Sequence, residues 1–127
     1  MEIMKNRRPV YLNLIKIRLP LPALVSILHR ISGALIFLAI PVLLCWFQSS
    51  LSSAESFNNF KQSFSNPVLK ISLLVLLWAY MHHFFAGIRF LLLDLHTGID
   101  LRSARVGSAI VLIISLTLTL ILGARLW

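Results

Sequence analysis

The sequence predicts an all-α integral membrane protein with three transmembrane helices. Of its 127 residues, 58% are hydrophobic and only 13% are charged, and the mean hydropathy is +0.87. Soluble domains are about 45–50% apolar and about 25% charged, and a short soluble chain could not bury such an excess. Three long apolar stretches instead match the roughly 20 residues that one helical crossing needs. Helices are expected because these runs are continuous, whereas barrel strands alternate in polarity.

We expect a single transmembrane domain over residues 1–127, with helices at about 21–47, 67–93 and 106–127. The first helix opens on Leu19-Pro-Leu-Pro-Ala, since proline is tolerated in a first turn. It would be about 39 Å long, which exceeds the roughly 30 Å hydrocarbon core. Its first two turns should therefore lie at headgroup depth. Pro41 removes one hydrogen bond further along this helix.

The formal charge of +8 is distributed unevenly along the chain. Basic residues precede the first helix and occupy the second loop: Lys5, Arg7, Arg8, Lys16 and Arg18, then Arg102 and Arg105. By the positive-inside rule, the N-terminus and this loop are expected in the cytoplasm and the C-terminus outside. The first apolar run is too long and starts too late for a signal peptide, and Glu2 argues against a mitochondrial presequence. A bacterial inner membrane is therefore the expected location. We do not expect nucleic-acid binding, because the sequence contains no surface domain that combines basic and aromatic residues.

Polar residues inside the first helix are the first candidates for function, because ionisable groups in a spanning segment are costly. Ser26, His29, Arg30 and Gly33 fall at i, i+3, i+4 and i+7, which is one helical face. In the alternative interpretation, Arg30 extends to the headgroups and His29 makes only a packing contact.

The second helix carries two adjacent histidines. His83, Gly87, Phe90 and Asp94 share one face, and His82 shares another with Arg89. Because this helix runs from outside to inside, its histidines should lie at the depth of the polar residues of the first helix. A neutral imidazole is a common axial ligand of haem iron, and Gly87 is expected to leave an opening for a porphyrin. Spacing does not distinguish His82 from His83, and a histidine that only packs between helices is the alternative.

Two segments together carry a family resemblance. Ser26-Ile-Leu-His-Arg-Ile-Ser-Gly33, followed by His83-Phe-Phe-Ala-Gly-Ile-Arg89 and Asp94, resembles the signature of the cytochrome b membrane-anchor subunits of succinate dehydrogenases. The resemblance covers nearly the whole chain. It implies that the three helices form part of a membrane helical bundle with a sister anchor subunit, and that the two subunits share haem b.

The resemblance also implies roles for individual residues. Ser26 and Arg30 would line the ubiquinone site, and His29 would lie with Arg30 beside the haem propionates. His83 would be the axial ligand of the haem iron, with the second ligand supplied by the sister subunit. The family often has a histidine directly after the arginine of the second helix, where this chain has Phe90. No propionate or proton-path role is therefore carried over to that position, and the role of the adjacent His82 is left open.

The implied function is that of a subunit which is not catalytic alone. It would pass electrons, delivered from succinate through flavoprotein and iron–sulfur subunits, to ubiquinone in the respiratory chain and the tricarboxylic acid cycle. A fixed cation such as Arg30 suits a quinone oxygen that gains negative charge. The alternative is a cofactor-free structural anchor of a fumarate reductase-type complex. A transporter would need an intramembrane carboxylate or inverted repeats, and a dihaem cytochrome would need two histidine pairs.

Overall fold

The computed structural model describes residues 18–126, which form four α-helices and no strand. In chain order these are α1 (Leu21–Ser50), α2 (Ala54–Ser63), α3 (Pro67–Asp94) and α4 (Leu101–Leu126). Three of them, α1, α3 and α4, are long and apolar enough to cross a membrane. The predicted all-α membrane fold with three spans is confirmed. The basic residues predicted before the first helix at positions 5–16, and Trp127, lie outside the described part.

The two longest helices both have a proline in their first turn. Pro22 occupies the first turn of α1, and Pro67 begins α3, where the side chain of Asn66 accepts a hydrogen bond from the N–H of Val68. The helix α1 continues through Pro41 to a length of 30 residues, or about 45 Å. It therefore extends beyond the hydrocarbon core, as the sequence indicated.

The polar segment after α1 contains a short helix that the sequence analysis did not predict. Ser53 caps α2 with its side chain, and Glu55 in the first turn and Lys61 in the last turn suit the helix dipole. The ring of Phe60 packs edge-on against Trp46 of α1, with 4.8 Å between the ring centroids. Hydropathy could not reveal α2, because this helix lies at the end of the bundle and has only 10 mostly polar residues, too few and too polar for a membrane span.

The last helix begins five residues earlier than the expected position 106. Arg102 and Arg105 therefore belong to α4, whereas the sequence analysis placed them in a loop. Asp100 caps the helix by accepting the N–H of Ser103 at 2.9 Å, and hydrogen bonds from Ser103 hold the pKa of its carboxyl below the ordinary value. Hydropathy marks where the hydrocarbon begins, whereas the helix begins at its cap.

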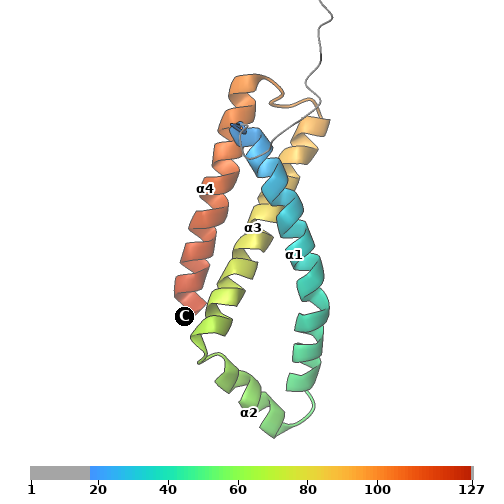
Figure 1. Ribbon diagram of the computed structural model, residues 1–127, viewed down its shortest axis with the longest axis vertical. Helices are drawn as coiled ribbons and strands as arrows, with labels where there is room; N and C mark the ends of the chain where they lie inside the picture. The colour runs from blue at the N-terminus through green and yellow to red at the C-terminus, as the bar shows by residue number, and fades with distance from the viewer. Residues whose placement is uncertain (1–17, 127) are drawn as a thin grey trace, which may run out of the picture.

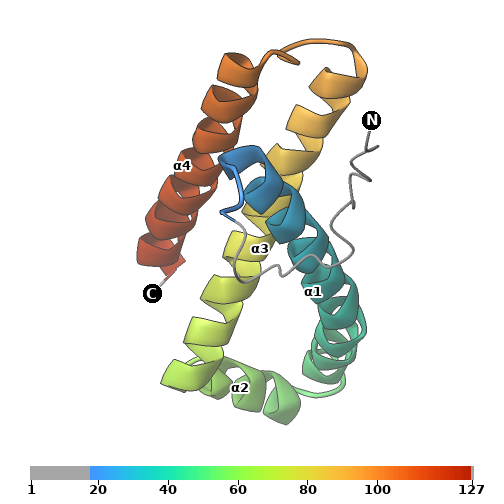
Figure 2. The same ribbon diagram turned by 45° about the horizontal axis from the view of Figure 1, so that its top comes forward.

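The helix α3 lies between α1 and α4 and contacts both (Figure 1). The first turns of α1 cross α3 and approach α4, which Figure 2 shows from a second direction. The buried apolar core of the described residues is small: Val25, Ala86 and Val111 form one cluster, and Ala79 is also buried. The face of α4 that is buried carries small and hydroxyl side chains, including Ser108, which donates to its own helix carbonyl at Ala104. Most large apolar side chains point outward, as expected where helices face lipid or other subunits.

Candidate functional site

Two histidines from different helices stack directly on each other inside the membrane span. The rings of His29 on α1 and His83 on α3 have centroids 4.2 Å apart and planes within 9°. Each ring lies near a glycine of the opposite helix. A Cβ atom on Gly33 would lie 2.8 Å from Cε1 of His83, and one on Gly87 would lie 3.7 Å from Nε2 of His29. The space at Gly87 that the sequence analysis expected to be open for a porphyrin is therefore bordered by His29.

The hydrogen bonds of His83 determine which of its ring nitrogens carries the proton. Nδ1 lies 3.0 Å from the carbonyl oxygen of His29 and 3.4 Å from Oγ of Ser32. Because a carbonyl oxygen only accepts, Nδ1 must be the donor. Nε2 then carries a lone pair, has no hydrogen bond in the described chain, and is not among its enclosed atoms.

Ser32 supports this arrangement and was not assigned a role from the sequence. Its side chain is 1% exposed, and its Oγ donates to the carbonyl oxygen of His29 at 2.9 Å. The Ser32 hydroxyl thus lies beside the ring of His83 and beside the His29 carbonyl oxygen that orients this ring. The available signal was its place next to Gly33 and one turn after His29, within the polar part of the first helix.

The neighbouring His82 has a different environment. It is 0% exposed, and its ring stacks on Trp78 with 5.3 Å between centroids. Within residues 18–126 neither ring nitrogen has a hydrogen-bond partner of ordinary geometry, although the backbone of Val25 lies close to the ring. In the same part of the chain, Nε2 of His29 is also buried without a hydrogen-bond partner. A buried ring nitrogen without a hydrogen bond costs free energy unless a ligand or a water molecule provides the missing bond.

The polar residues of α1 do not all point the same way. His29 and Gly33 face α3, whereas Arg30 is exposed and Ser26 is half-buried. Neither Arg30 nor Ser26 has a hydrogen bond or ion pair from its side chain within residues 18–126. Successive helical residues differ by about 100°, so one predicted face includes both inward and outward positions. Arg30 and Ser26 are therefore available to a group that approaches the chain from outside.

The residues of α3 that follow the two histidines pack against α1 and α4. Phe90, at the position where the family often has histidine, lies 5.1 Å from the ring of His29. Arg89 is buried, and its Nη2 donates to the carbonyl oxygen of Ala104 at 3.3 Å. Arg89 thus connects α3 to the first turn of α4. Asp94 is exposed at the end of α3.

The donor set suits a cofactor that needs one protein ligand from this chain. Within residues 18–126, no group of three or more His, Cys, Asp or Glu side chains could hold a metal ion. A haem iron, however, needs only one axial ligand from each of two sources. A histidine whose other ring nitrogen donates to a carbonyl is the usual form of a metal ligand. His83 fits this pattern, and the unpartnered nitrogen of His29 lies next to it.

The fold and these side chains define a multi-pass helical membrane subunit with a histidine pair between two of its spans. The family of succinate dehydrogenase/fumarate reductase transmembrane subunits matches residues 4–122, and the chain belongs to this family. It is accordingly a membrane-anchor subunit of a succinate dehydrogenase complex and is not catalytic alone.

Individual relatives agree with the family assignment. The chain is 34% identical to the succinate dehydrogenase cytochrome b556 subunit of Coxiella burnetii, over 98% of this chain and 100% of the relative. It is 30% identical to the subunit of that name from Rickettsia felis, over 92% and 91%. The corresponding subunit of Paracoccus denitrificans is 28% identical over 84% and 82%.

Proposed function

We propose that this subunit binds haem b through Nε2 of His83, and that Ser26 and Arg30 form part of a ubiquinone-reducing site. The observation that carries the haem proposal is the hydrogen bond from Nδ1 of His83 to the carbonyl oxygen of His29. This bond leaves Nε2 with its lone pair and without a hydrogen bond. The name cytochrome b556 of the relatives supports the same cofactor.

The contrast between the two adjacent histidines supports the choice of His83. His82 is fully enclosed in this structure, so its ring is not accessible to a cofactor at a subunit interface. His83 is half-buried and lies at the contact of α1 with α3. A haem shared with a sister anchor subunit would receive its second axial ligand from that subunit.

The neighbouring residues of α1 suit the remaining parts of such a site. The exposed Arg30 guanidinium can pair with a propionate by charge-assisted hydrogen bonds. His29 holds the ring of His83 by stacking and through its backbone carbonyl, while its own Nε2 is buried without a hydrogen bond among residues 18–126. Haem, when bound, supplies a one-electron carrier whose potential depends on its axial ligands.

For the quinone, Arg30 and Ser26 lie one helical turn apart and close to the beginning of α1. Arg30 stabilises negative charge that develops on a quinone oxygen, because a fixed cation in a water-poor site needs no reorganisation. Ser26 donates one hydrogen bond. In the proposed orientation, the start of α1 lies at the cytoplasmic side of a bacterial inner membrane. There an iron–sulfur subunit, itself supplied by a flavoprotein subunit, can dock within electron-transfer range.

The decisive experiment is a reduced-minus-oxidised visible spectrum of the purified complex. His83→Leu should abolish or severely perturb a b-type spectrum with two histidine ligands. His82→Leu is the matched control on the next residue and should leave the spectrum nearly normal. If His82 proves essential instead, the ligand assignment is wrong. If the wild-type complex has no haem spectrum, the subunit is a cofactor-free anchor.

A further inference from the structure

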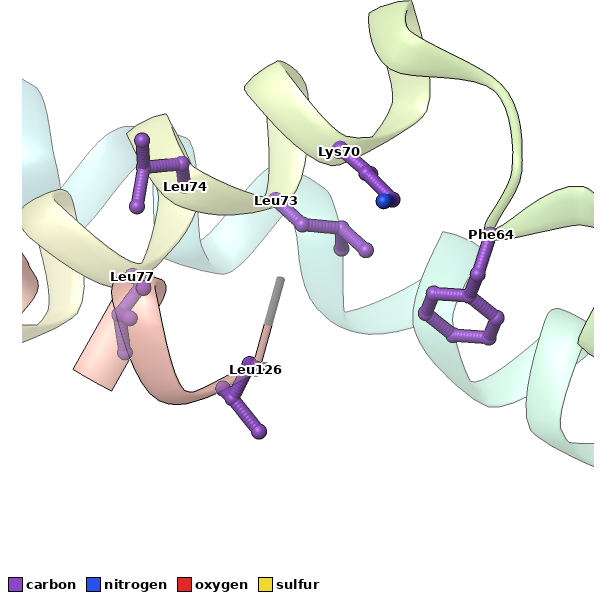
Figure 3. A pocket seen from close by; sticks show the side chains of 7 residues that line it. Phe64, Lys70, Leu73, Leu74, Leu77 and Leu126 are labelled. Carbon is purple, nitrogen blue, oxygen red and sulfur yellow. The ribbon is translucent and has the colours of Figure 1, made fainter.

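A pocket lies at the end of the bundle opposite the beginning of α1. It has a volume of about 430 Å³ and opens between the first turns of α3 and the last turn of α4 (Figure 3). Its wall on α3 is Leu73, Leu74 and Leu77, and its edges are Phe64, which follows α2, and Leu126 of α4. The pocket is therefore an apolar hollow on a membrane-facing part of the chain.

A second hollow continues the first one toward the middle of the membrane. It measures about 280 Å³, lies between α1 and α3, and shares Leu73 and Leu77 with the first. The two hollows exist because α1 and α4, which meet near the start of α1, diverge toward the α2 end (Figures 1 and 2). The two hollows therefore adjoin each other at Leu73 and Leu77, in the first half of α3.

One charged side chain lines the pocket, and it lies where a lipid headgroup would be. Lys70 belongs to the first turn of α3, and Figure 3 shows its side chain beside Leu73 at the pocket. Leu77 lies seven residues further along, which is about 10 Å deeper in the membrane. Lysine at this position presents its ammonium at headgroup level while its methylenes contact apolar surface.

The charge at this end of the bundle favours an anion. Lys61 in α2 and Arg125 in the last turn of α4 accompany Lys70. Glu55 is the only acidic residue in the described segments at this end, 48–70 and 119–126. Basic residues next to a membrane attract anionic lipid, with about 1 kcal/mol for each side chain near the surface.

We propose that this pocket binds one anionic phospholipid from the leaflet that contains α2. Its phosphate contacts Lys70, and one acyl chain lies over Leu73 and Leu77. Lys70 already has another interaction within the chain, and an ammonium group with three N–H donors can engage the phosphate as well.

The test uses the complete complex, delipidated in detergent and titrated with phosphatidylglycerol or phosphatidylcholine while native mass spectrometry counts bound lipid. Lys70→Gln should weaken phosphatidylglycerol binding about fivefold and leave the weaker phosphatidylcholine binding unchanged. Lys61→Gln is the matched control, because Lys61 lies at the same end over the ring of Phe57 and does not line the pocket. It should weaken phosphatidylglycerol binding clearly less than Lys70→Gln does, because Lys61 contributes only to the overall charge of this end and does not line the pocket.

A second variant tests the apolar part of the site without a change of charge. Leu77→Phe adds bulk where the two hollows meet and should weaken the binding of both lipids in a complex that still assembles. The proposal fails if Lys70→Gln and Lys61→Gln bind phosphatidylglycerol equally. It also fails if Leu77→Phe binds lipid like the wild type, or if a structure of the complex places a helix of another subunit in the pocket.

Discussion

Replacing Gly33 with alanine should disturb His83, the histidine that we propose as the haem ligand. The added Cβ would lie 2.8 Å from Cε1 and 3.2 Å from Nδ1 of His83. Ordinary contacts of a Cβ atom begin at about 3.4 Å, so the ring or the helix must move by about 0.6 Å. The ring cannot move freely, because it stacks on His29 and donates to the carbonyl oxygen of His29.

The expected cost follows from these contacts. A lost hydrogen bond is worth about 0.5–1.5 kcal/mol, or up to roughly tenfold in an equilibrium constant. Loss of the group that orients a metal ligand typically lowers metal affinity about 10- to 100-fold. We therefore expect Gly33→Ala to lower the haem content of the purified complex and to alter its visible spectrum.

Gly87→Ala is the matched control, because the two glycines occupy reciprocal positions in the same helix contact. A Cβ atom on Gly87 would lie 3.7 Å from Nε2 of His29, which is an ordinary contact. The assay compares the haem-to-protein ratio and the reduced-minus-oxidised spectrum of the two variants. Wild-type haem content in Gly33→Ala, or equal loss in both variants, would refute this reasoning.

Three further predictions concern the quinone site, the topology and the cap of α4. Arg30→Ala and Ser26→Ala should lower quinone reduction by one to two decades, more for Arg30, because a hydrogen bond to a charged group is worth about 1.5–3 kcal/mol. Succinate oxidation by a soluble dye should survive, and wild-type quinone reduction in Arg30→Ala would mean that Arg30 only reaches for headgroups. Reporter fusions at residue 127 should be active outside the cytoplasm and fusions in the 96–104 segment inside, and the opposite pattern would contradict the orientation. Since the pKa of Asp100 is lowered in the fold, its stabilising effect is complete above the ordinary value and is lost as the pH falls through the lowered one. The melting temperature of Asp100→Ala should therefore be below that of the wild type at neutral pH, and the difference should shrink in acid; a constant difference would argue against the ionised cap.

Much of the candidate site could be predicted from the sequence because its residues stand out chemically. His29, Arg30 and His83 are ionisable groups in apolar runs, where such groups are costly and therefore rare without a function. Ser32 could not be recognised in this way, since a serine in a membrane helix usually donates to a carbonyl of its own helix. Its contact with His83 depends on how α1 and α3 are rotated against each other.

The three membrane spans could be predicted from the sequence alone, because a helical crossing of the bilayer needs only a local run of about 20 apolar residues. The ends of the helices could not, since α2 and the beginning of α4 depend on caps such as Ser53 and Asp100. Spacing alone did not distinguish the two adjacent histidines, and the family resemblance favoured His83. The packing of the helices shows how they differ, since His82 is enclosed while His83 stacks on His29 of α1. His82 and His83 differ by about 100° around the same helix, and the rotation of α3 against its neighbours turns one into the core and the other onto Gly33.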